Sequence, residues 1–498
     1  MNQPDFIVVG AGSAGCVLTR RLTEDFNATV TLVEAPSSPA PTRDRHRPAN
    51  WIKLLKSAED WNFSTEPTPS LANRPLQWPR GRGIGGSSRI NAMIWFPPTE
   101  ADVNRLAHAS DNHWNAGRIH SAVKSIEQLL QPEDPRWLSR PSQSFLDATR
   151  LLADCKPMVY RRLNRLGKRT SLRSLIQTTL ESPEPWEHRI EVVRGIADQL
   201  VWVDEKITGI ELLTENGKTK LVSRYGVILA SGAIGTPTIL MRSGIGCPDA
   251  LKEHGIASRV ENLSVGKNLR DHLIMPVIFQ QFSNADRFSP FDDPRHLARW
   301  QTLGSGPLSS NLAECGGLFL ADTVQLHVTP THYLTFPKED ATAWMTIGVN
   351  VTQPQSCGHL RLRSADPLEP PAITSKYLDQ HQDLEQAIQG VEFVRELAKL
   401  GAFRDTILTE VLPGPKRSTA GAIARSIERY SQTLYHPLGT CAAGNHPEDA
   451  VDHRFRLRNS CGLWVVDGSV FPGITMGNPN ATIMSLAWMA AEEIAAAR

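Results

Sequence analysis

Three glycines near the start of the chain have the spacing of a nucleotide-binding turn. Gly10, Gly12 and Gly15 lie between an apolar run at 6–9 and helix-like residues at 16–22. In such a strand–turn–helix unit the first glycine allows the tight turn, the second lets the backbone approach a pyrophosphate, and the third allows close helix packing. The phosphates would then lie on the helix N-terminus, whose free N–H groups favour negative charge.

An acidic residue at the expected distance supports this interpretation. Glu34 ends a second apolar run, 19 residues after Gly15, and would accept hydrogen bonds from the adenosine ribose hydroxyls. An ordinary tight turn is the alternative, but it does not require an acid there. The phosphate site would include Ser13 and Ala14. Because no arginine replaces Glu34, NADP is disfavoured, and FAD and NAD both remain possible on these residues alone.

The composition predicts a globular protein of two or three domains. The 498 residues are 40% hydrophobic and 21% charged, and 53 basic residues against 52 acidic ones give a net charge of +1. This balance predicts no nucleic acid partner and no attraction to anionic membranes. The basic stretch 160–169 is interpreted as a solvated cationic face.

The cysteines and the hydropathy pattern predict the compartment. Seven scattered cysteines, without a CxxC pair or a histidine cluster at ligand spacing, are typical of a reducing environment and predict no metal site. The first strand follows the N-terminus directly, which leaves no room for a signal peptide. Since no apolar run reaches about 18 residues, we expect no membrane span and a cytoplasmic protein.

Later segments of the chain repeat the pattern of a glycine-rich turn followed by a helix. A second glycine-rich loop at 79–89 precedes helix-like residues at 90–95, and a second strand–turn–helix unit occupies 226–241. Residues 190–214 alternate as strands do, and Asn216 with Gly217 predicts a hairpin. Parallel strands would gather these turns at one edge of a sheet, where open α/β sheets bind ligands.

The second half of the chain changes character. Between 275 and 430, segments such as 325–329 and 358–363 predict half-buried antiparallel strands of a separate domain on the substrate side. The last residues return to α/β character, with a buried-type strand at 463–467 and a helix over 483–497.

These blocks, in this order, resemble the glucose-methanol-choline (GMC) oxidoreductases, FAD-dependent enzymes that act mainly on alcohols. The resemblance covers nearly the whole chain through the blocks 10–34, 60–67, 79–93, 231–246, 265–272, 310–317, 435–441 and 466–482. It implies an α/β fold, in which a Rossmann-like FAD-binding domain accompanies a discontinuous substrate domain built on an antiparallel sheet flanked by helices. The FAD-binding segments would be 1–135, 187–274 and 431–498, with a shortened lid segment at 136–186 and the substrate domain at 275–430.

The resemblance also implies where FAD binds. The pyrophosphate would lie on Gly12–Gly15 and the ribose on Glu34. The ribityl chain, the flavin ring and the phosphates would contact later residues, namely Gly85, Gly86, Ser87, Asn91, Asp467, Gly468, Asn478 and Pro479. Ile90 stands where some members carry a histidine bonded to the flavin, so FAD is expected to be noncovalently bound.

The catalytic residues are likewise implied by the resemblance. His436 lies at the position of the family's catalytic histidine, and would take the hydroxyl proton while hydride passes to flavin N5. Asn480 would stabilise the developing alkoxide, or else cap the last helix. Asn478 would be the more structural of the two asparagines. Glu314 is a weaker candidate for holding a cationic substrate, with a structural salt bridge as its alternative.

Two departures leave the substrate open. Residues 96–98 replace the Arg-Gly pair usual in the family, and the stretch 114–189 is shorter than in typical members. The expected reaction is oxidation of a primary or secondary small-molecule alcohol, with oxygen or another electron acceptor. A flavin-containing lyase of the hydroxynitrile type, or another non-oxidative use of the flavin, is the alternative. The sequence predicts no oligomeric state.

Overall fold

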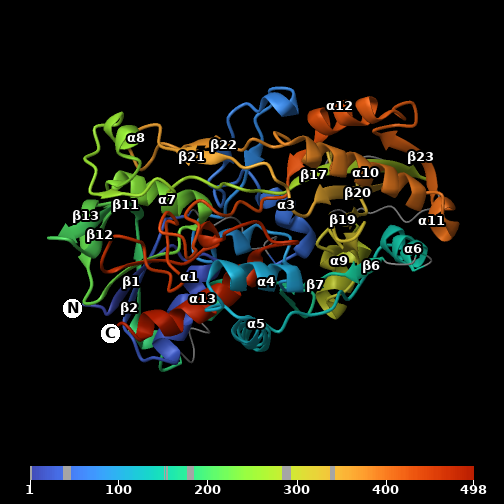
Figure 1. Ribbon diagram of the computed structural model, residues 1–498. Helices are drawn as coiled ribbons and strands as arrows, with labels where there is room; N and C mark the ends of the chain where they lie inside the picture. The colour runs from blue at the N-terminus through green and yellow to red at the C-terminus, as the bar shows by residue number, and fades with distance from the viewer. Residues whose placement is uncertain are drawn as a thin grey trace.

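The computed structural model describes residues 3–37, 46–150, 152, 155–176, 184–282, 293–336 and 343–498, with the side chain at position 402 left out. The expected lid segment at 136–186 therefore lies partly outside the described residues. Figure 1 shows two bodies of structure side by side, with both chain termini at the same end of the molecule.

A five-stranded parallel sheet forms the first body. Its strand order is β10-β2-β1-β14-β25, and every neighbouring pair is parallel. The strands are β1 (Phe6–Val9), β2 (Val30–Glu34), β10 (Ile190–Arg194), β14 (Gly226–Leu229) and β25 (Leu463–Val465). The three central strands β1, β2 and β14 are buried along their whole length, as continuous apolar runs in parallel sheets require.

Helices from opposite ends of the chain cover this sheet. α1 (Ser13–Glu24) follows β1 directly and packs against α13 (Asn480–Ala495), the last helix of the chain. Figure 1 shows the two helices side by side near the termini. α7 (Gly232–Arg242) follows β14. The sheet therefore joins segments that are hundreds of residues apart, which is the discontinuous arrangement that the sequence predicts; the domain boundaries themselves stay a prediction.

A seven-stranded antiparallel sheet forms the second body. Its order is β23-β17-β20-β19-β18-β6, with β24 paired to β17 beside this path. The strands are β6 (Lys156–Val159), β17 (Leu273–Gln281), β18 (Cys315–Phe319), β19 (Val324–Thr329), β20 (Trp344–Val351), β23 (Ile407–Leu412) and β24 (Gln432–Thr433). One face packs on α6 (Arg140–Thr149), α10 (His381–Leu397) and α12 (Ala420–Tyr430). The expected fold class is confirmed.

The other face of this sheet is polar but not wet. We expected residues 325–329 to have one side in water, and that expectation is wrong: all six residues of β19 are buried. Leu326 and Val328 belong to the apolar core, while His327 and Thr329 face a cavity between the two bodies. The polar face is therefore covered by the parallel-sheet body rather than by solvent.

A smaller antiparallel unit lies between two strands of the parallel sheet in the sequence. It consists of β11 (Ile196–Val203), β12 (Lys206–Thr214) and β13 (Gly217–Val222). Thr214 pairs with Gly217, whose φ of 101° suits only glycine well, so the predicted hairpin is confirmed.

Three local expectations are wrong. Residues 90–95 form no helix: a 3₁₀ turn over Gly86–Arg89 is followed by β5 (Ile94–Trp95), because the Asn91 side chain accepts the Met93 N–H and closes a turn instead. The last helix begins at 480 rather than 483. The basic stretch 160–169 is no solvated face, since Arg162 and Arg169 are buried.

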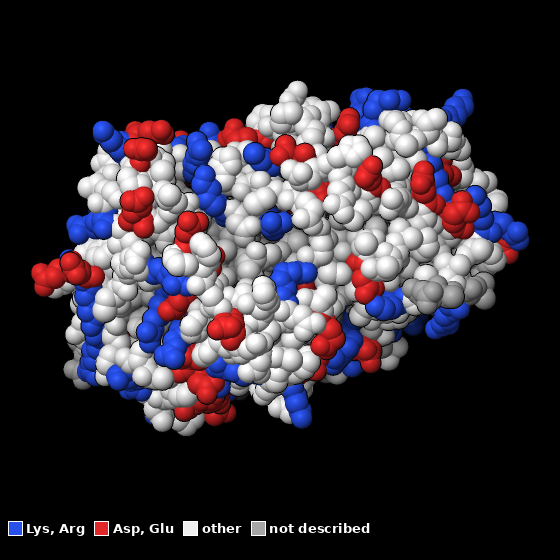
Figure 2. Space-filling view, in the orientation of Figure 1, with Lys and Arg blue, Asp and Glu red and all other residues white. Residues whose placement is uncertain are grey.

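The surface agrees with the balanced charge of the chain. Figure 2 shows acidic and basic side chains interspersed over the visible face. Within the described part of the chain, no helix combines the length and apolar character that a membrane crossing requires.

Candidate functional site

A cavity of about 890 Å³ lies between the two bodies. One wall consists of the carboxyl ends of parallel strands, including Val9, Val33 and Ala230. The opposite wall is the polar face of the antiparallel sheet, including His327 and Gly348. Ligands of open α/β sheets bind at this edge, so the cavity has the position expected of a cofactor site that opens onto a substrate site.

Each of the first three glycines has a separate steric role. A Cβ on Gly10 would lie 2.5 Å from the Ala230 oxygen, and the φ of Gly10 is 104°. A Cβ on Gly15 would lie 1.8 Å from the Gly10 oxygen, so this glycine permits helix packing. A Cβ on Gly12 would meet nothing within 4 Å and would point into open space at the cavity. No side chain caps α1, which leaves its first N–H groups available to an anion.

Glu34 is fixed at the cavity by backbone amides. Its Oε2 accepts from Ala11 N at 2.7 Å, and its Oε1 accepts from Ala35 N at 3.0 Å and Gly83 N at 3.2 Å. Burial raises the pKa of this carboxyl, and the amide hydrogen bonds oppose that rise. The carboxylate thereby connects the first glycine turn to the second glycine-rich loop.

The two glycine-rich loops touch. A Cβ on Gly86 would lie 2.7 Å from the Gly12 Cα, and the Gly85 N–H donates to the Ala11 oxygen at 2.8 Å. Arg169 supports the second loop from behind, donating to the Ser88 oxygen at 2.9 Å. Burial lowers the pKa of Arg169 to about 9. The sequence interpretation missed this role, because a basic run carries no signal that one of its members is buried.

Asp467 connects the end of β25 to the start of α7. Its Oδ2 accepts from Gly232 N at 2.8 Å and from the Thr236 hydroxyl, and its Oδ1 accepts from Ser469 N at 2.7 Å. The carboxylate is therefore satisfied by the protein itself. The neighbouring Gly468 lines the cavity, and its backbone oxygen accepts from the Gly439 N–H at 3.0 Å.

The residues expected to bind the cofactor fit a long polar ligand. Almost all of them line the one cavity: Gly10, Gly12, Ser13, Ala14, Glu34, Gly86, Ser87, Asn91, Asp467, Gly468, Asn478 and Pro479. Gly15 and Gly85 are absent from the lining and support it from behind. Two buried amide atoms of lining residues, Asn478 Oδ1 and Asn480 Nδ2, have no partner among the described residues. Ile90 also lines the cavity, and its aliphatic side chain forms no covalent bond to a flavin.

His436 lies on the cavity wall with both ring nitrogens engaged. Its Nε2 lies 3.1 Å from Asn478 Nδ2, and its Nδ1 lies 2.9 Å from His272 Nδ1. Burial lowers the pKa of His436 well below its ordinary value of 6.5, and the nearby His272, His327 and Arg80 lower it further. His436 therefore remains neutral and able to accept a proton at neutral pH.

Asp271 holds the backbone of the His436 loop. Its Oδ1 accepts from the His436 N–H at 2.7 Å, and its Oδ2 accepts from the Thr433 and Tyr377 hydroxyls. Burial raises the pKa of Asp271 to about 6, against these hydrogen bonds. Both Asp271 and His272 belong to the recognised block 265–272, but the sequence alone did not assign them a role.

The two asparagines have different partners from those expected. Asn478, and not Asn480, contacts His436. Asn480 Oδ1 instead accepts from the Ser13 hydroxyl at 2.6 Å, at the start of α1. Asn480 is also not the cap of the last helix, because Pro479 occupies the N-cap position and no side chain caps it.

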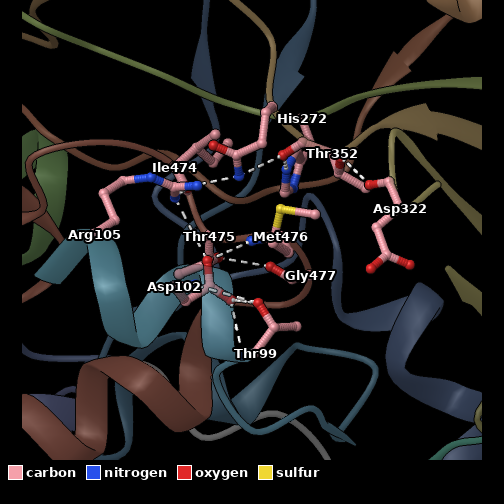
Figure 3. Close-up of polar contacts among 11 residues, drawn as sticks. Thr99, Asp102, Arg105, His272, Asp322, Thr352, Ile474, Thr475, Met476 and Gly477 are labelled. Carbon is pink, nitrogen blue, oxygen red and sulfur yellow. Dashed lines mark hydrogen bonds and ion pairs between the residues drawn. The ribbon is translucent and has the colours of Figure 1, made fainter. Parts of the chain in front are cut away.

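The loop that precedes Asn478 is anchored to α4 (Glu100–Ala109). Figure 3 shows the polar contacts between this helix and residues 474–477. Asp102 forms a capping box with Thr99 and also accepts the Met476 N–H at 2.9 Å, while Arg105 donates to the Ile474 oxygen. These contacts fix the direction from which the Asn478 side chain enters the cavity.

Glu314 lies outside the cavity lining and is fully buried. Its Oε2 accepts from the Ser139 N–H, the Ser139 hydroxyl and the Ser142 hydroxyl, and its Oε1 accepts from the Ser310 hydroxyl. These contacts place a negative charge at the N-terminus of α6, which the helix dipole stabilises. The geometry assigns Glu314 to the structure of the second body rather than to a cation-binding wall.

His327 is a titratable residue of the opposite wall. Burial lowers its pKa to about 3, and neither of its ring nitrogens has a hydrogen-bond partner among the described residues. The neighbouring Thr329 and Thr331 also line the cavity. This wall therefore presents neutral polar groups, which the sequence interpretation did not identify.

Comparisons with known proteins agree with this geometry. Family models described as GMC oxidoreductase match residues 4–162 with 185–274, and residues 354–487. An alcohol dehydrogenase [acceptor] of Pseudomonas putida is 31% identical, with 98% of this chain and 95% of that protein covered. An oxygen-dependent choline dehydrogenase of Escherichia coli O127:H6 is 28% identical, with 97% of this chain and 94% of that protein covered.

Solved structures share the whole fold. Pyridoxine 4-oxidase from Mesorbium loti has a TM-score of 0.85 at 24% identity, with 98% of each chain covered. A formate oxidase of Aspergillus oryzae has a TM-score of 0.90 at 22% identity, with 99% of this chain and 98% of that chain covered. With the cavity and its glycine loops, these findings identify the chain as a flavoprotein oxidoreductase whose cofactor is FAD. The chain belongs to the GMC oxidoreductase family.

Proposed function

We propose that this protein oxidises a primary or secondary alcohol to the carbonyl compound, with His436 as the base. The observation that carries the proposal is the buried, neutral His436 on the cavity wall, with its Nε2 3.1 Å from Asn478 Nδ2. The names of an alcohol dehydrogenase and a choline dehydrogenase among the relatives support an alcohol as the substrate class.

The residues of this chain have complementary tasks in such a reaction. FAD, held by the two glycine-rich loops, would supply the hydride acceptor for the carbinol carbon. His436 accepts the hydroxyl proton at Nε2, and the Asn478 amide donates a hydrogen bond to the same oxygen as negative charge develops there. Asp271 and the contacts of α4 keep these two side chains in position.

The position of Glu314 narrows the substrate class. Since its carboxylate oxygens accept from hydroxyl groups and a backbone amide of the protein and it does not line the cavity, we do not propose that it binds a cationic substrate. The wall around His327 and Thr329 instead supports a neutral alcohol.

Anaerobic mixing of the holoenzyme with a panel of alcohols tests the proposal, with flavin absorbance as the measurement. At least one alcohol should bleach the oxidised flavin. His436→Ala should slow bleaching by about 10²–10⁴-fold, because a general base contributes that much to rate. The control is His381→Ala, which changes an exposed histidine of α10 and should bleach at the parental rate.

Two outcomes would contradict the proposal. If the flavin of a His436→Ala variant bleaches at the parental rate, His436 is not the base. Cyanohydrin cleavage without bleaching by any alcohol would favour the lyase alternative. Admission of air after bleaching then separates an oxidase, which reoxidises rapidly and releases peroxide, from a dehydrogenase that uses another acceptor.

A further inference from the structure

Two buried histidines contact each other through their Nδ1 atoms at the site. His272 Nδ1 and His436 Nδ1 are 2.9 Å apart, and the two rings meet nearly edge to face. Two ring nitrogens at hydrogen-bond distance require that one carries hydrogen and the other presents a lone pair. The position of that one proton decides which nitrogen of His436 is free to act as a base.

The second nitrogen of His272 settles the direction of this hydrogen bond. His272 Nε2 lies 3.0 Å from the Thr352 backbone oxygen. A carbonyl oxygen only accepts, so the hydrogen resides on His272 Nε2. His272 is fully buried, and burial lowers its pKa to about 4, against the opposing effect of the Thr352 and Thr475 backbone, so its ring is neutral and carries one hydrogen. His272 Nδ1 is therefore the acceptor, and His436 Nδ1 is the donor.

We propose that His272 is a positioning residue that fixes the tautomer of His436. With hydrogen on Nδ1, the neutral His436 ring presents its lone pair at Nε2, beside Asn478 and the cavity. The other tautomer would place hydrogen on Nε2 and leave no base there. The inference rests on the proposed function for its consequence in catalysis, but the tautomer itself is a property of the resting protein.

The surroundings hold His272 in this orientation. The Thr352 oxygen that it contacts also accepts from Gln353 Nε2 at 3.0 Å, and the same amide nitrogen lies 3.0 Å from the Ile474 oxygen. Figure 3 shows His272 and Thr352 above the loop that leads to Asn478. The Thr352 hydroxyl in turn donates a hydrogen bond to the Asp322 backbone oxygen at 2.7 Å. The backbone acceptor is thus fixed by contacts independent of His436.

His272, His327 and Arg80 each lower the pKa of His436 through their charge. His272 also lowers the pKa of His327. The Asp271 carboxylate is directed at the His436 backbone N–H rather than at either ring. In the reaction, the substrate hydroxyl proton moves to His436 Nε2. The Nδ1 hydrogen stays in place, and its bond to His272 strengthens as His436 becomes charged.

Two variants of His272 separate the effect of the His436 tautomer on the rate from the effect of side-chain packing. In His272→Asn the amide oxygen lies where Nδ1 lay and still accepts from His436. In His272→Leu no acceptor remains. We expect His272→Leu to lower the limiting rate of flavin reduction about 10–100-fold with little change in KM, as is usual when a supporting hydrogen-bond partner is lost. We expect His272→Asn to stay within about threefold of the parent. FAD content and circular dichroism check the fold of each variant.

The ¹⁵N NMR spectrum of the histidine-labelled holoenzyme provides a readout that needs no substrate. His436→Gln identifies the His436 signals. In the parent, His436 should carry hydrogen on Nδ1 and none on Nε2, and His272 the reverse. In His272→Leu the His436 signals should shift toward the mixture of tautomers that a free imidazole shows.

The outcomes distinguish this inference from the proposed function. If no alcohol reduces the flavin but the parent shows the Nδ1-H tautomer, the proposed function fails and the tautomer assignment stands. Hydrogen on His436 Nε2 in the parent would overturn the inference, and so would an equal loss of rate in His272→Leu and His272→Asn. If His272→Leu does not fold, the parent spectrum and the His272→Asn rate still decide.

Discussion

Two asparagines separated by a single residue differ in what their side chains contact. Asn478 lies beside the ring of His436, while Asn480 contacts the Ser13 hydroxyl near the N-terminus of α1. The expectation from the sequence gave the catalytic role to Asn480 and the structural one to Asn478. The contacts lead us to propose the reverse assignment, because only Asn478 is within hydrogen-bond distance of the base.

Alanine substitutions at the two asparagines should have different effects. Asn478→Ala should lower the rate of flavin reduction by about 10²-fold, as loss of one donor to a developing oxyanion does, with FAD still bound. Asn480→Ala should weaken FAD binding about fivefold, the effect of one hydrogen bond, and change the reduction rate less. Stopped-flow reduction and FAD titration of the apoprotein measure the two effects. The opposite pattern would restore the original assignment.

At the scale of elements, two glycine-rich loops meet at the end of the first strand. Gly86 of the second loop lies against the Gly12 backbone, and Glu34 accepts amides from both loops. The contact is possible only because neither loop carries a Cβ there. The pair of loops thus forms one surface for the cofactor, although about 70 residues separate them.

Substitutions at Gly12 and Gly10 should separate cofactor binding from folding. Gly12→Ala adds a Cβ that meets no protein atom within 4 Å, so the apoprotein should fold normally and bind FAD about tenfold or more weakly. Gly10→Ala adds a Cβ only 2.5 Å from the Ala230 oxygen at a positive φ, so the apoprotein itself should unfold at a lower temperature. The apparent Tm without FAD and a titration with FAD check these two predictions. If Gly12→Ala binds FAD with the parental affinity, the pyrophosphate is not placed at Gly12.

At the scale of the whole molecule, three segments bring neutral histidines together at the interface of the two bodies. His272 precedes β17, His327 lies in β19 and His436 lies in the loop after β24. Burial lowers the pKa of each: to about 4 for His272, to about 3 for His327 and well below 6.5 for His436. Folding therefore keeps neutral three groups that take up protons in the unfolded chain.

This cluster should make the folded protein sensitive to acid. Between its unfolded pKa of 6.5 and its folded pKa, each histidine binds more protons in the unfolded state, so its contribution to stability falls as the pH falls. Buried carboxyls with raised pKa, such as Asp271, act in the opposite direction. The measurement is therefore the difference in unfolding free energy between a variant and the parent. Relative to the parent, His327→Leu should gain up to about 1.4 kcal/mol of unfolding free energy for each pH unit below pH 6.5. A difference independent of pH would contradict a neutral His327.

The sequence by itself determined the fold class, the cofactor loops and the position of the histidine. Gly10, Gly12 and Gly15 could be interpreted because backbone geometry restricts which residues fit a turn, and local rules of this kind act within a few positions. The hairpin at Gly217 and a strand predicted at 463–467, which the structure places at 463–465, were predictable for the same reason.

Only the tertiary structure decided which side chains meet. Contacts between distant segments pair His436 with Asn478 and His272. Such contacts also bury Arg169 and place Glu314 outside the cavity. Sequence spacing cannot specify such contacts, since the direction of a side chain is set by the packing of two separate bodies. The sequence therefore identified the residues available for chemistry, and the fold assigned each one its partner.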